Sequence, residues 1–217
     1  MQAFRREGYT RCLIAMSGRE LMQRRCFLRL IALLLSVVWL TGCSAPQYLQ
    51  PTPERTVAVP SVGQGQAVTV AVVDGRDGPQ IGTRSGNAMS TSVITVEAGP
   101  LMPKLQAEAE RALRDMGFEP TTQTAQGRPR LTLTLQRLEY GRGQSRPLID
   151  EARLESVLVA KAENGGATYT GTYTSRRTQG YAVRPDLKDN TKMVAELLSD
   201  GLNRVFRDPE LGRFLAR

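Results

Sequence analysis

The sequence contains no histidine, and it has three cysteines among 217 residues. Without histidine, the chain cannot form a Ser-His-Asp triad, a Cys-His dyad or a zinc site of the Cys/His type. Asp74 and Asp77 stand in a run of turn residues, but the alternating Asp/Asn positions and the closing Glu of a calcium loop are missing. We therefore expect no metal and no cofactor, and any acid–base chemistry would rest on carboxylates alone.

Long apolar runs are also missing, since a helix that crosses a bilayer takes about 20 apolar residues. The run from Leu30 to Trp39 has instead the length of the apolar core of a secretory signal, and it follows Arg24, Arg25 and Arg29. It ends in Leu40-Thr41-Gly42-Cys43, which resembles the bacterial lipobox.

This resemblance implies cleavage between Gly42 and Cys43 and lipidation of Cys43. It also implies several acyl chains, because one chain holds a protein to a membrane only weakly. An Asp after the cysteine favours retention in the inner membrane in this class, so Ser44 implies an outer-membrane anchor with the domain in the periplasm. Cys12 and Cys26 leave with the leader, and no disulfide is expected although the periplasm permits one.

The N-terminus leaves two questions open. Residues 1–21 are polar, and residues 22–42 form a complete signal peptide without them, so we interpret 1–21 as a misplaced extension. Translation then starts at Met22 rather than Met1. Because Arg24-Arg25 resembles the twin-arginine export motif, both that route and the general secretory route remain open.

Most of the net charge of +8 comes from the leader, and less of it from the mature chain. Seven of the 29 basic residues and two of the 21 acidic residues precede Cys43, which leaves a net charge of +3. Nucleic-acid binding needs a concentrated basic face, so we expect no nucleic-acid partner.

Residues 43–66 contain four prolines and predict an extended tether after the lipidated cysteine. At about 3.1 Å per residue, such a tether could hold a domain up to about 60 Å from the membrane. Residues 67–217 are then one periplasmic domain.

Hydrophobic periodicity predicts the elements of this domain. Strands are expected at 67–73, 93–96 and 130–140, with a hairpin of 153–163 and 167–176 that turns at Asn164-Gly165. Helices are expected at 101–116, from Asp189 or Asn190 to about 207, and from Pro209 onwards. The order predicts an α+β fold, an antiparallel sheet of four to six strands with two main helices packed on one face.

One cluster of side chains suggests a place for a partner. The chain after the hairpin reads as a basic loop, and two tyrosines share a face of the return strand; the candidates are Tyr169, Tyr173, Arg176, Arg177, Tyr181 and Arg184. An anionic glycan, a lipid phosphate or an acidic protein could dock on them. The alternative is a solvated surface of an arginine-rich sequence.

The arrangement resembles the YajG family of uncharacterised bacterial lipoproteins. The resemblance rests on the lipobox, the Pro-rich segment, the run Val70 to Asp77, the helix that ends at Met116-Gly117-Phe118, the strand from Leu131, the turn at Glu163 to Gly166 and the C-terminal helix. It implies no catalytic residues.

Three classes of function remain. The first is a non-enzymatic envelope lipoprotein that binds or scaffolds an unidentified envelope protein. The second is a periplasmic binder of a small molecule or glycan. The third is a carboxylate-dependent hydrolase, for which no paired carboxylate motif is visible. We expect no enzymatic activity.

Replacing Cys43 tests the anchor. We predict that Cys43→Ala abolishes lipidation and cleavage, because the diacylglyceryl group is transferred to a thiol. Metabolic labelling with a clickable palmitate measures this, and Cys26→Ala is the matched control that should keep its label. Equal labelling of wild type and Cys43→Ala would contradict the lipobox assignment.

Overall fold

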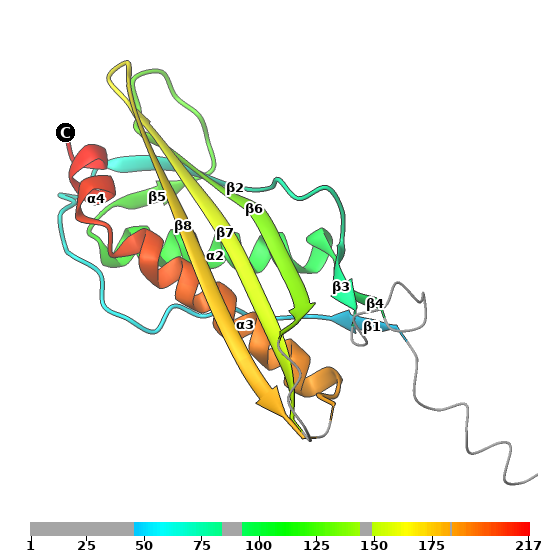
Figure 1. The fold of residues 1–217 in the computed structure, drawn as a ribbon. Helices are drawn as coiled ribbons and strands as arrows, with labels where there is room; N and C mark the ends of the chain where they lie inside the picture. The colour runs from blue at the N-terminus through cyan, green and yellow to red at the C-terminus, as the bar shows by residue number, and fades with distance from the viewer. Residues whose placement is uncertain (1–45, 84–92, 144–148, 183) are drawn as a thin grey trace, which may run out of the picture. The chain divides into compact units, whose positions relative to one another are not determined.

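The computed structural model describes residues 46–83, 93–143, 149–182 and 184–217 (Figure 1). These residues contain eight strands and three helices. The strands are β1 (Gln47–Leu49), β2 (Ala67–Asp74), β3 (Gln80–Thr83), β4 (Val93–Val96), β5 (Glu119–Thr121), β6 (Arg130–Arg142), β7 (Asp150–Asn164) and β8 (Ala167–Tyr181). The helices are α2 (Ala98–Asp115), α3 (Leu187–Phe206) and α4 (Pro209–Leu215).

The fold is α+β, but the sheet is mixed and has eight strands, so the prediction of an antiparallel sheet of four to six strands is wrong. Antiparallel pairing joins β6 to β7, β7 to β8, and β3 to β4. Parallel pairing joins β1 to β4, and β2 to both β5 and β6. Parallel partners lie far apart in the sequence, and no local turn motif predicts them.

Strand β6 has three partners for its two edges. One edge pairs with β7 from Arg130 to Arg142. The other edge pairs with β2 over Arg130–Leu135 and then with β3 at Tyr140. The sheet therefore divides along β6, and the groove described below lies where β3 replaces β2.

A β-bulge sits in β6 at this division. The register with β7 shifts between Leu135 and Arg137. Before the bulge, Leu131, Leu133 and Leu135 are fully buried, and after it Leu138 and Tyr140 take over the buried positions. The alternation of buried and outward-facing side chains therefore does not continue unbroken through Tyr140. The extra residue turns Arg137 and Glu139 toward the open face of the sheet.

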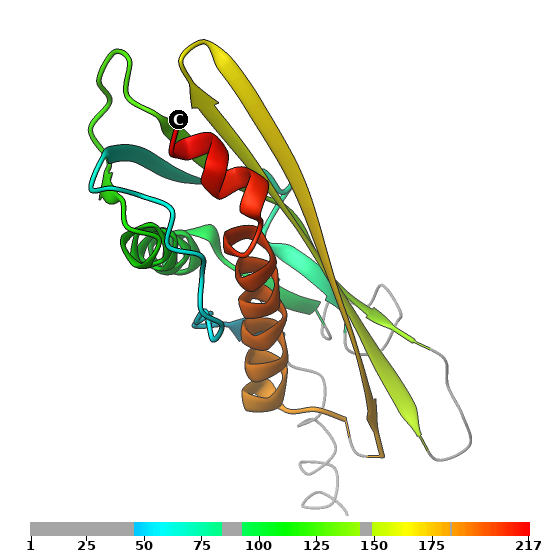
Figure 2. The same cartoon turned by 90° about the vertical axis from the view of Figure 1, so that its left-hand side faces the viewer.

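The helices cover one face of the sheet, as predicted, and the other face is open (Figure 2). Helix α2 packs on β2 and β5, and α3 packs on β7 and β8. The core between the layers includes Leu105, Leu158, Leu198 and Phe206, all fully buried. Among the described residues, no helix combines the length and apolarity that a membrane span requires.

Local capping signals explain the helix ends. Helix α2 ends before Gly117, whose φ of 92° fits the predicted C′ position. Helix α3 begins earlier than predicted, because Asp186 is the N-cap and its carboxylate accepts a hydrogen bond from the N–H of Asp189 at 2.8 Å. Asp208 caps α4 as expected. The hairpin is also confirmed, but its turn lies one residue later than Asn164-Gly165: Asn164 pairs with Ala167, and the two turn residues are Gly165 and Gly166, both at positive φ.

The expected spacer at 44–66 is part of the domain from Gln47 onwards. Strand β1 adds to the sheet beside β4. Asn203 of α3 then holds the following residues, because its Oδ1 accepts from the N–H groups of Thr56 and Val57 at 3.1 and 3.2 Å. Further on, the N–H groups of Val62 and Gly63 both donate to the carbonyl of Met116, at the end of α2. Residues 47–65 therefore do not form a free tether.

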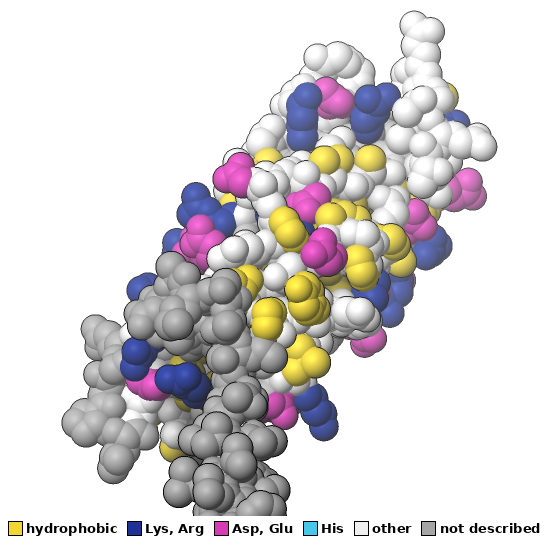
Figure 3. Space-filling view, turned by 90° about the vertical axis from the view of Figure 1, so that its right-hand side faces the viewer, with side chains coloured by type: hydrophobic (Ala, Val, Ile, Leu, Met, Phe, Trp, Pro, Cys, Tyr) yellow, Lys and Arg dark blue, Asp and Glu magenta, His cyan; other side chains and the backbone are white. Residues whose placement is uncertain are grey.

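The free edge of β2 is closed by a side chain. Gln106 of α2 accepts a hydrogen bond from the Val72 N–H at 2.9 Å and donates one to the Val70 carbonyl at 3.3 Å. These are the bonds that a neighbouring strand would make, so this edge is protected from further strand pairing. The side of the molecule in Figure 3 shows hydrophobic side chains in its middle with charged side chains around them, and Val73 of β2 is 46% exposed.

A buried polar network fixes β1 to the domain. The Tyr140 hydroxyl donates to Oδ1 of Asn190 at 3.0 Å, and Nδ2 of Asn190 donates to Oε1 of Gln47 at 2.6 Å. Asn190 is fully buried and thus joins β6, α3 and β1. Such a network stabilises the fold when its members are satisfied.

We predict that Asn190→Ala lowers the free energy of unfolding by about 1–3 kcal/mol, because it leaves the buried Tyr140 and Gln47 groups without this partner. Urea denaturation monitored by circular dichroism measures the change. Thr191→Ala is the matched control on the same turn, since its exposed hydroxyl donates only to the Leu187 carbonyl. Equal midpoints for the two variants would show that the network does not hold β1.

Candidate functional site

The six side chains proposed as a docking cluster do not form one site. Tyr169, Tyr173 and Tyr181 lie on β8 and pack against the core, on the side of the sheet that the helices cover. Arg177 points to the same side and forms an ion pair with Glu196 of α3. Arg176 lies on the open side of β8. The proposed basic loop is therefore mostly strand, and the pleat separates its members.

Arg184 lies outside β8, in the segment before α3, and is exposed. It therefore does not join the tyrosines either.

Tyr169 and Tyr173 have a structural partner. Both hydroxyls donate to Oδ2 of Asp208 at 2.6 Å, and Oδ1 of Asp208 accepts from the Glu210 N–H at 2.8 Å. Burial, and then the bond to Asp208, raises the pKa of Tyr173 far above its usual value. Burial alone would raise the pKa of Asp208, but the two tyrosine hydrogen bonds and the backbone N–H groups outweigh it and leave that pKa lowered. The cluster joins β8 to α4.

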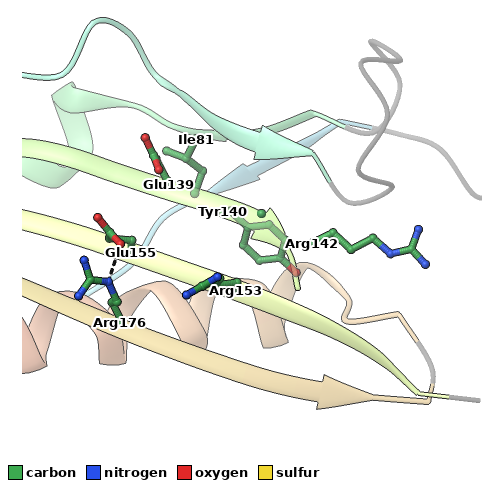
Figure 4. Close-up of a pocket in the computed structure, with 8 residues that line it drawn as sticks. Ile81, Glu139, Tyr140, Arg142, Arg153, Glu155 and Arg176 are labelled. Carbon is green, nitrogen blue, oxygen red and sulfur yellow. Dashed lines mark hydrogen bonds and ion pairs between the residues drawn. The ribbon is translucent and has the colours of Figure 1, made fainter. Parts of the chain in front are cut away.

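A groove on the open face of the sheet is the better candidate for a binding site (Figure 4). It encloses about 710 Å³ and lies at the end of β6 where β3 has replaced β2. Its lining residues come from four strands and are Ile81, Glu139, Tyr140, Gly141, Arg142, Arg153, Glu155 and Arg176.

Strand register brings the charged residues of the groove together. Glu139, Glu155 and Arg176 lie directly opposite one another on β6, β7 and β8. Gly141 and Arg153 form the next row with Thr178. Residues opposite one another on adjacent strands share a face, so each row projects its side chains into the same space.

Two glutamates opposite each other would repel, and two arginines prevent this. Arg176 Nε lies 2.7 Å from Glu155 Oε2, and Arg137 lies 3.4 Å from Glu155 and 3.7 Å from Glu139. The hydrogen bond from Arg176 is the largest cause that lowers the pKa of Glu155, and the charge of Arg137 adds to it. Glu155 is therefore ionised at neutral pH.

Arg153 differs from the other arginines of the groove. Arg142 pairs with Asp150 at 2.6 Å and Arg176 pairs with Glu155. Among the described residues, Arg153 has no ion pair or hydrogen bond, and it is exposed. Because its neighbour in the row is Gly141, no side chain from β6 covers it. A guanidinium in this position can bind a carboxylate or phosphate through two parallel hydrogen bonds.

Gly82 allows β3 to close the groove. A Cβ at this position would lie 1.8 Å from the Tyr140 carbonyl oxygen, so only glycine permits the pairing of β3 with β6 there. This approach places the neighbouring Ile81 on the rim of the groove.

A second hollow of about 490 Å³ adjoins the groove and shares Ile81 and Glu139 with it. Its wall includes Arg76, whose side chain is 4% exposed and binds Asp74 at 2.8 and 2.7 Å. The side-chain hydrogen bond from Arg76 lowers the pKa of Asp74. Asp74 and Arg76 thus stabilise the turn after β2. Among the described residues, no group of His, Cys, Asp and Glu side chains is suited to hold a metal ion.

Sequence reasoning found Arg176 but missed the remaining charged residues of the groove. The signal was present, since Glu139, Arg153 and Glu155 stand at polar positions of the strands that it predicted. These side chains become neighbours only through the β6–β7 register and the bulge in β6. Cys43, Gly42 and Ser44 lie outside the described residues.

We predict that Asp208→Asn destabilises the domain at neutral pH by about 1–3 kcal/mol, because both tyrosines lose a charged acceptor. The pKa of Asp208 in the folded state lies below its usual value of 3.8. Its stabilisation is therefore complete above about pH 4 and is lost as the pH falls through the folded-state value.

Thermal melting between pH 2 and 7 measures this effect, and the curves of wild type and Asp208→Asn should converge at the acid end. Asp200→Asn is the control, because the exposed Asp200 makes no hydrogen bond among the described residues. A constant difference between wild type and Asp208→Asn across this range would contradict the assignment.

Several solved structures are similar to this chain. A protein from Xanthomonas campestris is 19% identical and covers 79% of this chain and 95% of its own, with a TM-score of 0.44. A minor lipoprotein from Acinetobacter baumannii is 11% identical and covers 71% and 92%, with a TM-score of 0.39. PelC from Paraburkholderia phytofirmans, solved as a dodecamer, is 14% identical and covers 70% and 95%, with a TM-score of 0.33. Similarities this low carry no inference about function.

No curated protein matches the sequence. A family model described as uncharacterized lipoprotein matches residues 53–216, which span almost the whole described domain. The chain therefore belongs to this family of uncharacterised lipoproteins.

Proposed function

We propose that the protein is a YajG-like lipoprotein of the outer membrane, anchored through Cys43, whose periplasmic domain binds a partner and catalyses no reaction. The family match supports lipid anchoring. The signal at 22–42 and Ser44 support export and sorting to the outer membrane, which fractionation of membranes on a sucrose gradient checks.

The observation that carries the binding role is the arginine groove. Arg153 and Arg176 share a face of the sheet with the two glutamates, whereas Arg142 pairs with Asp150. Arg176 pairs with Glu155, and Arg153 has no acidic partner among the described residues. The groove therefore presents an unneutralised guanidinium beside fixed ion pairs. We propose that it holds an anionic group of the partner, a phosphate or a carboxylate.

Facing carboxylates also define the alternative, a carboxylate-dependent hydrolase. Glu139 and Glu155 face each other across β6 and β7. However, both glutamates already have arginine partners, Glu155 in Arg176 and Arg137 and Glu139 in Arg137, so the carboxylates are held in ion pairs. The ion pairs thus favour binding over hydrolysis.

In-cell photocrosslinking from the groove tests the binding role. A photoreactive residue at Thr178, beside Arg153 in the same row, should give crosslinked products. We predict that Arg153→Glu reduces these products at least fivefold, because it turns an attraction for the anionic group into a repulsion.

Arg128→Glu is the control, since Arg128 is partly exposed in the loop before β6, near the hairpin turn, where its guanidinium donates to the Gln123 carbonyl. It should leave the products from Thr178 unchanged. A photoreactive residue at Thr168, at the far end of the same strand face, controls for position. Absence of products from Thr178, or an equal yield with Arg153→Glu, would show that the groove is not the binding site.

A further inference from the structure

The first described residues of the chain and the arginine groove lie at the same end of the domain. Strand β1 begins at Gln47, so only three residues separate it from Cys43. Four Cα–Cα steps of about 3.3–3.6 Å reach at most about 14 Å. A lipid on Cys43 therefore holds the beginning of β1 close to the membrane surface, and not at the 60 Å that a free tether would allow.

Strand pairing connects this point to the groove. Gln47 pairs with Ile94, Gly82 pairs with Ile94, and Gly82 pairs with Tyr140. One row thus runs from the first residue of β1 through β4 and β3 to β6. With neighbouring strands about 4.8 Å apart, Tyr140 lies about 14 Å from Gln47 along the sheet.

The rows of Glu139 and Gly141 flank the row of Tyr140, and they hold Arg176 and Arg153. Figure 1 shows β1, β3 and β4 at the end of β6 that is opposite the hairpin turn and the C-terminus. The groove and the beginning of β1 thus share one end of the sheet.

We infer that the groove binds the headgroup phosphate of an anionic phospholipid in the membrane that holds Cys43. This inference rests on the proposed lipid anchor and names the ligand of the proposed binding site. Arginine binds phosphate through paired hydrogen bonds, and Arg153 has its guanidinium free of any described carboxylate. Ile81 lines the groove but is 5% exposed and belongs to the core, so the contacts expected with the lipid are those of its phosphate with the arginines.

Alternative occupants are less consistent with this geometry. A soluble acidic protein or glycan would have to enter between the groove and the membrane surface that the anchor holds near it. A headgroup is already there at high local concentration, because the anchor makes the encounter intramolecular.

Hydrogen–deuterium exchange of the mature lipidated protein in vesicles tests the inference. One set of vesicles contains phosphatidylcholine alone, and the other contains phosphatidylcholine with phosphatidylglycerol. We expect slower exchange at 137–142 and 174–180 in the anionic vesicles, and unchanged exchange at the hairpin turn, 163–168. The protection should disappear in Arg153→Glu and in high salt, and it should persist in Arg128→Glu.

A second measurement removes the anchor. Residues Pro46 to Arg217 form one compact unit that contains the described core, so the mature chain with Cys43→Ser keeps its fold without lipid. It should sediment with the anionic vesicles, and Arg153→Ala should weaken this binding about fivefold, the factor that corresponds to ~1 kcal/mol for one basic residue at an anionic surface.

The outcomes separate the two proposals. Equal exchange in both vesicle types, or the same protection from inorganic phosphate with phosphatidylcholine vesicles, overturns the lipid assignment. Crosslinked products from Thr178 that are proteins or glycans also overturn it but leave the proposed binding role intact. Failure of the wild-type protein to acquire lipid overturns the anchor itself, and palmitate labelling detects that separately.

Discussion

Strand β6 has two edges and pairs with three strands along them, and the rest of the structure follows from this constraint. Its β7 edge is filled along its whole length, so β2 and β3 share the other edge end to end. Two strands that meet on one edge cannot both pair along it, and residues 136–139 of β6 lie between them. The bulge at this point directs Arg137 and Glu139 outward, and Gly82 lets β3 close in beyond it. The charged groove is the result of this division.

Polar contacts join segments that are distant in the sequence at both ends of the domain. At the groove end, Asn190 joins β6 and α3 to β1. At the hairpin end, Asp208 joins α4 to the two tyrosines of β8, and Nδ2 of Asn164 donates to the Phe214 carbonyl at 3.1 Å. Hydrophobic burial is non-directional, whereas these bonds fix which segment lies where. They explain how short elements such as β1 and α4 hold their places.

The parts of the fold that local chemistry determines could be predicted from the sequence. The stripe of α2, the glycine after it, the cap at Asp208 and, to within one residue, the hairpin turn all depend on residues within a few positions of one another. The bulge also left a local trace, because the apolar spacing along β6 changes from two to three between Leu135 and Leu138.

The parallel pairings and β1 could not be predicted in the same way. Gln47-Tyr48-Leu49 is too short to show a strand pattern, and the prolines around it favour an extended spacer. It pairs with β4 and hydrogen-bonds through Gln47 to the buried Asn190, which lies 143 residues further along the chain. The site shares this difficulty, because Glu139, Glu155 and Arg176 become neighbours only through the register of three strands. The prediction that the tyrosines belong to a docking site was wrong. The alternation of side chains along a strand shows which residues share a face, but it does not show whether the helices cover that face.

The unpaired edges of β2 and β8 are treated differently, and this bears on how the domain can contact other molecules. Gln106 closes the edge of β2 with hydrogen bonds that imitate a strand. On the other side, β8 pairs with β7 alone among the described strands, and no equivalent side chain closes its outer edge there. Edge strands are usually protected against association. If the groove end is held at a membrane, as proposed, the hairpin turn points away from the lipid, and the long edge of β8 runs from the surface toward the solvent.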